Sequence, residues 1–248
     1  SPSHFTWMDT NYPAGTPRTG FPIEIQSLWH KALVLLAKVT KEKSWKDLAD
    51  KVRASVIELY WKEEQGFLSD CLHAETCIPA KEAIADDALR CNQLFAVTLG
   101  LVEGEIARQV VLSSEELLVP GAIRSLADRP VKHPIAVKND AGQNLNDPHN
   151  PFWGEYVGDE DTRRKPAYHN GTAWSWPFPS YSEALLKVSG DKEQALAILN
   201  SSRVLFDTGC LGQLPEVQDG DSPHWQRGCD AQAWGVTEVY RVLKLVKE

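Results

Sequence analysis

The segment TWMDTNYPAGTPRTGFPIEIQSLWHKALVLLAKV, residues 6–39, joins a loop with aromatic and charged side chains to the start of a helix. Pro22 suits the first turn of an α-helix, because the N–H group that proline lacks has no partner there. Apolar residues then recur at intervals of three and four, the period of an amphipathic helix: Ile25, Leu28, Trp29, Ala32, Leu35 and Leu36. The segment therefore predicts a helix over about residues 22–39, entered from a polar loop.

The same helical period returns along the chain and predicts a mainly helical protein. Ser44 and Asp47 resemble a capping box at the start of the second helix. No segment has a strong period of two, so we expect strands only as brief hairpins in loops and assign the chain to the all-α class. The further helices are expected over about 44–65, 86–100, 103–118, 180–189, 191–207 and 230–247.

Residues 119–179 hold more than half of the 15 prolines and almost no helical period. Pro, Asn, Asp and His in such density predict a long irregular excursion. Loops of this length are uncommon in compact domains and tend to be functional. Tyr168, His169 and Trp174 lie at its end, where they would line a binding subsite or form a packed aromatic loop.

The composition restricts the class of partner. A net charge of -8 without a basic block argues against a nucleic acid or an anionic membrane surface. The chain has neither a run of about 18 apolar residues nor a signal-peptide pattern, so a cytoplasmic protein is expected. Its five cysteines form no C-x-x-C pair and are interpreted as free thiols.

The chain is rich in tryptophan, with nine residues. Five of them stand beside Pro, Gly, His or acidic residues in segments with the character of loops: Trp7, Trp153, Trp174, Trp176 and Trp225. A flat ring with one polar edge suits recognition at such positions, and the apolar C–H faces of sugar rings stack on it. The tryptophans therefore favour a carbohydrate ligand.

Two acidic residues far apart in sequence fit glycosidic chemistry. Hydrolysis needs one acid to protonate the leaving oxygen and a second carboxylate to activate water or to attack. Asp9, beside Trp7 and Met8, is expected to be partly desolvated and hence protonated, while Glu216 in a polar loop would stay ionised as the base. From the residues alone, the interpretation of Asp9 as a cap or turn residue and of Glu216 as a solvated loop charge is favoured, because lone acidic residues are common in loops.

Further polar residues lie close to apolar helix faces, where they would serve as pocket contacts or as surface salt bridges. They are Arg18, Glu24, Arg90, Asn92 and Gln93. From the residues alone, the surface interpretation is favoured.

Two groups of potential metal ligands lie close together in sequence: Asp219, Asp221 and His224, and Asp70, His73 and Cys77. Neither repeats a known ligand spacing, so no metal and no other cofactor is predicted. The usual nucleotide-binding and serine-hydrolase motifs are absent from the sequence.

Five sequence blocks together resemble the C-terminal amylo-alpha-1,6-glucosidase domain of glycogen debranching enzymes. In chain order they are Thr6-Trp7-Met8-Asp9, Gly15 to Arg18 with Glu24 to Trp29, Arg90 to Ala96, Tyr168 to Trp174, and Gly228 to Trp234. The resemblance implies the second half of an (α/α)6 barrel, with residues 1–248 forming one catalytic-domain fragment. The missing N-terminal half of the barrel would be its partner.

The resemblance also implies a reaction. It is the inverting hydrolysis of the α-1,6-linked glucose at a branch point of glycogen or limit dextrin, with Asp9 as general acid and Glu216 as general base. The residues expected to contact the branched α-glucan are Trp7, Arg18, Glu24, Trp29, Arg90, Asn92, Gln93, Tyr168, His169, Trp174, Trp225 and Gln232.

The chain departs from the family pattern at two positions. Cys91 stands where a proline is usual, and Gln218 stands where an aromatic residue commonly precedes the aspartate. Neither change removes a predicted catalytic group, although Gln218 would alter the pocket wall. An inverting glucosidase or trehalase on the same barrel, and a non-catalytic carbohydrate-binding fragment, remain as alternatives.

Overall fold

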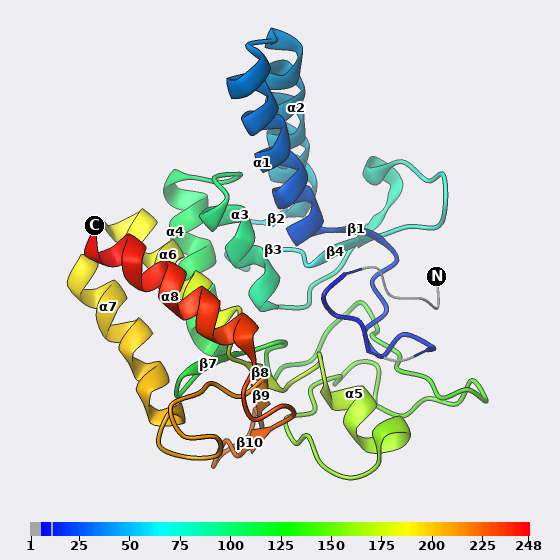
Figure 1. The fold of residues 1–248 in the computed structure, drawn as a ribbon. Helices are drawn as coiled ribbons and strands as arrows, with labels where there is room; N and C mark the ends of the chain where they lie inside the picture. The colour runs from blue at the N-terminus through cyan, green and yellow to red at the C-terminus, as the bar shows by residue number, and fades with distance from the viewer. Residues whose placement is uncertain (1–5, 11) are drawn as a thin grey trace.

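A computed structural model describes residues 6–10 and 12–248, and helices dominate it (Figure 1). The α-helices are α1 Ile23–Thr40, α2 Lys43–Tyr60, α3 Leu94–Thr98, α4 Gly104–Ser114, α5 Lys165–Ala167, α6 Phe178–Ser189, α7 Lys192–Asn200 and α8 Ala233–Lys247. Short 3₁₀ turns cover Ala80–Glu82, Cys91–Gln93, Glu115–Leu117 and Ser201–Leu205, and a π-helical turn covers Glu160–Arg164.

Three small antiparallel sheets join the helices, so the all-α assignment is wrong in its strict form. Their orders are β1-β4-β5, β2-β3 and β10-β9-β8-β7-β6. The strands are β1 Gly20–Pro22, β2 Trp61–Lys62, β3 Phe67–Leu68, β4 Cys71–His73, β5 Ile84–Ala85, β6 Leu118–Val119, β7 Ala122–Arg124, β8 Ala173–Trp174, β9 Val217–Gln218 and β10 Gln226–Arg227. Strands of two or three residues are too short to give a period-two signal.

The longer helices form an open arc of two layers. Helix α1 packs against α3, α3 against α6, and α6 against α8. On this arc α2 packs against α1, α4 packs against α3 and α6, and α7 packs against α6 and α8. Buried residues of the inner helices and the loops between them form the main core, among them Ile23, Leu94 and Phe178. Helices α1 and α8 therefore stand at the two ends of the arc.

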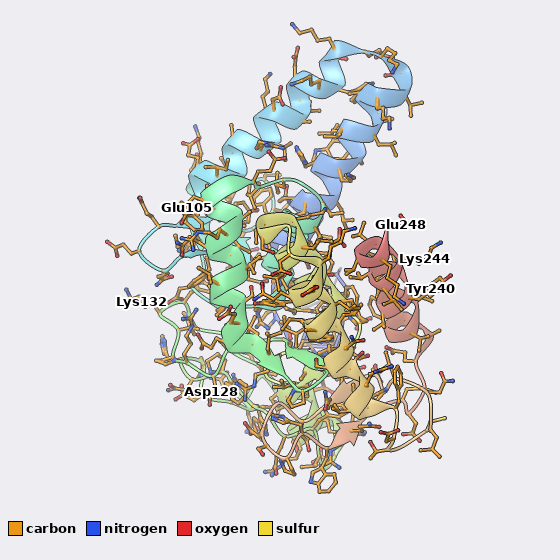
Figure 2. The ribbon with its side chains drawn as sticks, turned by 90° about the vertical axis from the view of Figure 1, so that its left-hand side faces the viewer. Glu105, Asp128, Lys132, Tyr240, Lys244 and Glu248 are labelled. Atoms are coloured by element: carbon orange, nitrogen blue, oxygen red, sulfur yellow. The ribbon has the colours of Figure 1, made fainter. Side chains whose placement is uncertain are left out.

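The apolar face of α1 lies at the surface. Its buried side consists of Ile23, Glu24, Ser27, His30 and Leu33. The residues that gave the helical period are exposed instead, and together with Val39 we call them the α1 stripe: Ile25, Leu28, Trp29, Ala32, Leu35, Leu36 and Val39. Exposure reaches 58% at Leu35 and 70% at Val39. The α1–α2 pair projects from the body of the molecule in both views (Figures 1 and 2).

The opposite end of the arc also exposes apolar rings and side chains. On α8, Trp234, Val236, Tyr240 and Leu245 are exposed. Figure 2 shows Tyr240 and Lys244 on the outer side of this helix. Within residues 6–10 and 12–248, no helix is long and apolar enough to cross a membrane.

The predicted helices agree with the structure where the apolar period is long, as in α1, α4, α6 and α8. The capping box is wrong, because α2 is preceded by Glu42 and no side chain caps its first turn. The helix expected over 86–100 is also shorter than predicted. Residues 86–90 are non-helical, because the Asp86 carboxylate accepts hydrogen bonds from the backbone N–H groups of Asp70 and Cys71 and so ties this segment to β4.

The exposure of the five cysteines predicts their reactivity. Cys77, Cys210 and Cys229 are exposed, whereas Cys71 and Cys91 are buried. Burial raises the pKa of the Cys91 thiol to about 12 and raises that of Cys71 as well. Since the thiolate is the reactive form, Ellman's reagent should titrate the three exposed thiols in the native chain and the other two only after unfolding. Cys77→Ser should lower the native count by one and Cys91→Ser should leave it unchanged; rapid native labelling of all five would contradict the fold.

Candidate active site

A buried ion cluster holds the loop in front of α1. The Arg18 guanidinium donates to both oxygens of Glu24 on α1, each at 2.6 Å. It also donates to Asp70, from Nε to Oδ2 at 2.5 Å and from Nη2 to Oδ1 at 3.1 Å. The three side chains are 4% exposed or less. Arg18 therefore joins α1 to the turn between β3 and β4.

Asp70 connects this cluster to the loop that carries Asp9. The Asn92 amide donates to Asp70 Oδ1 at 2.8 Å and accepts at Oδ1 from the Trp7 indole N–H, also at 2.8 Å. Two residues after Trp7, Asp9 follows in the chain. The position of the Asp9 backbone is thus linked through Trp7 and Asn92 to the buried carboxylate of Asp70.

Arg90 extends the cluster on the other side of Asp70. Its Nε lies 3.5 Å from Asp70 Oδ2, and its Nη2 donates to Asn170 Oδ1 at 2.8 Å. Asn170 in turn donates to the backbone oxygen of Gly15 at 2.8 Å, and Arg90 donates to the backbone oxygen of His169. The residue 6–18 loop is thereby attached at both ends.

The charges in the cluster are balanced, and their pKa shifts follow from burial. Desolvation lowers the pKa of Arg90, only partly opposed by Asp70. At Arg18 desolvation acts the same way, but the adjacent Asp70 and Glu24 carboxylates raise its pKa above the ordinary value. Burial raises the pKa of Asp86, which is held behind Asp70 by hydrogen bonds from backbone N–H groups and by His73 at 3.0 Å.

An aromatic cluster forms the wall next to this network. The Trp7 ring makes edge contacts with His169, Trp174, Trp176 and Trp234 at centroid separations of 4.9 to 6.4 Å. His169 stacks on Trp174, and Trp176 stacks on Trp234 at 4.0 Å. These rings come from the first loop, the end of the long excursion and α8, so the cluster joins both ends of the chain.

Asp9 is presented to solvent from an anchored backbone. Its neighbour Met8 is buried, and on the other side Thr10 Oγ1 bonds to His169 Nδ1 at 2.7 Å. The Asp9 residue itself is exposed. The expectation that Trp7 and Met8 would partly desolvate Asp9 is therefore wrong, because both side chains are drawn into the protein by Asn92 and the aromatic cluster.

Glu216 is held at both carboxylate oxygens. Its Oε1 accepts the hydroxyl hydrogen of Tyr168, and its Oε2 accepts the backbone N–H of Cys229 at 3.0 Å. Gly228 has φ +68°, and a Cβ there would lie 2.5 Å from Glu216 Oε2, so only glycine leaves room for this carboxylate. Glu216 directly precedes β9, which pairs with β10.

Two hydrogen bonds connect the loops that carry Asp9 and Glu216 to two residues that are adjacent in sequence, His169 and Tyr168. Thr10, next to Asp9, bonds to His169, and Tyr168 bonds to Glu216. Burial raises the pKa of Tyr168, and the hydrogen bond to Glu216 and the negative charges of Glu216 and Asp9 raise it further. The charges of both predicted catalytic carboxylates therefore raise the pKa of the same tyrosine, although 207 positions separate the two residues in the sequence.

The other predicted contacts fall into two groups. Trp7, Tyr168, His169 and Trp174 lie together beside the two carboxylates. Five of the remaining residues already bind protein groups: Arg18, Glu24, Arg90 and Asn92 in the ion cluster, and Gln93 between Leu68 and Ser114. The other three lie elsewhere: Trp29 on the α1 stripe, Trp225 at 62% exposure on the β9–β10 loop, and half-buried Gln232 in front of α8. The surface interpretation of the ion-cluster residues is wrong, because they are buried.

Sequence reasoning missed several residues of this region. Trp234 on α8 is 40% exposed and stacks on Trp176. Tyr156 stacks on Tyr168 at 5.0 Å, and its backbone N–H donates to the Asp219 carboxylate at 2.8 Å. The high tryptophan content of the chain was a signal for Trp234, whereas no local pattern pointed to Tyr156.

Four of the side chains considered as metal ligands have other partners: Asp219, Asp70, His73 and His224. Asp219 forms an ion pair with Arg227 at 2.8 Å, and Asp70 lies between Arg18 and Arg90. In the described part of the chain, no group of three His, Cys, Asp or Glu side chains is arranged to hold a metal ion. A cavity of about 440 Å³ borders Arg18, Phe21 and Cys77, but its lining includes neither Asp9 nor Glu216.

Comparison with known proteins gives one family and one fold. The family model for amylo-alpha-1,6-glucosidase matches residues 2–241 of the chain. A search of curated proteins found no match. Among solved structures, neutral trehalase Nth1 from Saccharomyces cerevisiae is similar with a TM-score of 0.61 at 14% sequence identity. The similarity covers 98% of this chain and 40% of the trehalase chain, so this chain spans less than half the length of that protein.

The ion cluster predicts a large effect of one substitution. Asp70→Asn removes the negative charge between two buried arginines, and breaking a buried pair in this way typically costs about 3–5 kcal/mol of unfolding free energy. Denaturant unfolding followed by circular dichroism measures it. Asp50→Asn is the control, because it breaks an exposed ion pair with Lys46 and should leave the midpoint unchanged. Equal midpoints for both variants would contradict a stabilising role of the cluster.

Proposed function

The chain belongs to the amylo-alpha-1,6-glucosidase family, and from this premise we propose that it removes α-1,6-linked glucose from branch points of an α-glucan such as limit dextrin. Asp9 is the general acid and Glu216 the general base of an inverting reaction. The proposal depends on one observation above all. The loops that carry these two carboxylates are tied to consecutive residues, His169 and Tyr168.

In the proposed reaction the proton of the Asp9 carboxyl group passes to the glycosidic oxygen as the bond from that oxygen to C1 breaks. A water molecule attacks C1 from the opposite face and gives its proton to Glu216. The products are free glucose of inverted anomeric configuration and a glucan with a new hydroxyl group. Inversion requires the two carboxyl groups to be about 6.5–9.5 Å apart, so that the water fits between them.

The surroundings of the carboxylates support these roles. Asp9 is exposed and free to approach a bound sugar. Glu216 accepts two hydrogen bonds that favour its ionised form, and each carboxylate oxygen has a further lone pair with which to receive a proton. The two carboxylates thus differ in environment, since Glu216 is held by two donors and Asp9 is open to solvent.

The aromatic cluster supports a carbohydrate ligand. Trp234 at 40% exposure and the half-buried Trp7 and Tyr168 offer ring surface next to the carboxylates, and Trp225 is exposed on the neighbouring loop. We assign Arg18, Glu24, Arg90 and Asn92 to support of this surface, because their polar atoms already bind one another and Asp70.

The open arc supports a partner. We propose that the chain is the second half of an (α/α)6 barrel and that the N-terminal half covers the α1 stripe. Seven neighbouring apolar residues at helical spacing form a larger exposed patch than a helix facing only water carries. The trehalase that shares the fold is more than twice as long as the part that this chain matches. The cytoplasmic location and the exclusion of nucleic-acid and membrane partners stay predictions.

Two conservative variants test the reaction in the complete polypeptide that carries this sequence. Asp9→Asn and Glu216→Gln should each lower glucose release from limit dextrin by about 10²–10⁴-fold, the usual contribution of a general acid or base. The exposed carboxylates Asp207 and Glu193 provide the matched controls, since Asp207→Asn and Glu193→Gln should retain full activity. Proton NMR of the first glucose released should show the inverted anomer.

Other outcomes identify the alternatives. Faster release of glucose from trehalose than from limit dextrin would favour an inverting trehalase, in line with the shared fold. If Asp9→Asn and Glu216→Gln keep full hydrolysis or if no substrate is hydrolysed, while Trp225→Ala abolishes glucan binding, the chain is a carbohydrate-binding fragment.

A further inference from the structure

We propose that Tyr168, predicted from the sequence as a substrate contact, is the positioning residue that fixes the orientation and the charge of Glu216. This inference rests on the proposed function for its catalytic meaning, but the interaction itself does not require turnover. The Tyr168 hydroxyl donates to Glu216 Oε1. A donor at this oxygen stabilises the carboxylate form that a general base must have before it receives a proton from water.

The tyrosine can act in this way because its own position is fixed. Its ring stacks on Tyr156 at 5.0 Å and packs against Trp174 at 4.9 Å. Its backbone oxygen accepts hydrogen bonds from the Thr172 hydroxyl and from the Trp174 indole N–H at 2.9 Å. The hydroxyl is therefore held by the ring and the backbone, independently of Glu216.

The opposite oxygen of Glu216 is fixed by different elements. Oε2 accepts the Cys229 N–H at 3.0 Å, and the missing Cβ of Gly228 leaves the space that this oxygen occupies. Two donors on two oxygens determine the plane of the carboxylate. Tyr168 supplies the one donor of this pair that comes from a side chain, so substitution can remove it without changing the backbone.

The surroundings of the Tyr168 hydroxyl keep it protonated. Desolvation raises the pKa of Tyr168, and the hydrogen bond to Glu216 and the charge of Glu216 add to this increase, so the hydroxyl keeps its proton throughout the range in which the site works. Tyr168 is thus a permanent donor between two groups that exchange protons during turnover. It orients the base and takes no proton itself.

The test compares Tyr168→Phe with wild-type chain by carbon NMR titration of ¹³C-labelled glutamate carboxyl groups, with Glu216→Gln used to assign the signal. Loss of the donor should move the midpoint of the Glu216 titration upward by about one pH unit, since a hydrogen bond to a charged group is worth about that much. Tyr181→Phe is the matched control. It removes the hydroxyl of a second tyrosine–glutamate pair, Tyr181 and Glu115 at 3.4 Å, and should leave the Glu216 midpoint unchanged.

In the complete polypeptide, Tyr168→Phe should move the acid limb of the kcat/KM profile upward by the same amount and lower kcat at least tenfold, with KM changed less than twofold. A purely structural role would lower the thermal midpoint without moving the pH profile. A predominant role in substrate binding would raise KM with kcat unchanged. Either result would overturn the proposal.

Two further measurements keep the inference testable. If Tyr168→Phe fails to fold by circular dichroism, 4-fluorophenylalanine at position 168 fills nearly the same volume without donating a hydrogen, and the same upward shift is expected. If wild-type protein releases no glucose from any glucan, the proposed function fails, yet the NMR titration still decides on Tyr168. An unchanged Glu216 midpoint in a folded variant refutes the inference, whatever the activity.

Discussion

The buried carboxylate of Asp70 between Arg18 and Arg90 is the interaction on which the site depends. An isolated charge would be too costly in this interior, and an arginine without its carboxylate equally so. The cluster is tolerated because Glu24 supplies a second negative charge at bidentate geometry and because Asn92 satisfies the remaining side of Asp70. Three segments distant in sequence must come together for these charges to be paired, which selects one arrangement of the loops over others.

The two predicted catalytic carboxylates are outside this cluster but take their positions from it. Asp9 follows Trp7, whose indole is held by Asn92. Glu216 is held by Tyr168, and the backbone oxygen of the next residue, His169, accepts a hydrogen bond from Arg90. The ion cluster thus fixes backbone on both sides, and the aromatic rings fill the space between. Loops placed by buried charge pairs rather than by long strands can hold side chains firmly while leaving their surface open to solvent.

The sequence predicted what depends on local spacing. The apolar period located α1 and α8 to within a few residues, and the composition of residues 119–179 predicted their largely irregular course. The strands were not predictable, since each is two or three residues long, and neither was the burial of Arg18. Its partner Asp70 lies 52 positions away, and nothing in the spacing of either residue reports the other. The five blocks that indicated the family nevertheless include Arg18, because a resemblance to known sequences carries information on tertiary contacts that periodicity lacks.

Helix α1 joins the exposed apolar face of the molecule to its candidate site. One face of α1 carries the exposed stripe, and its first turn carries Glu24, which is buried against Arg18. The proposed N-terminal half would bury the stripe and so restrict the motion of the helix that anchors the cluster.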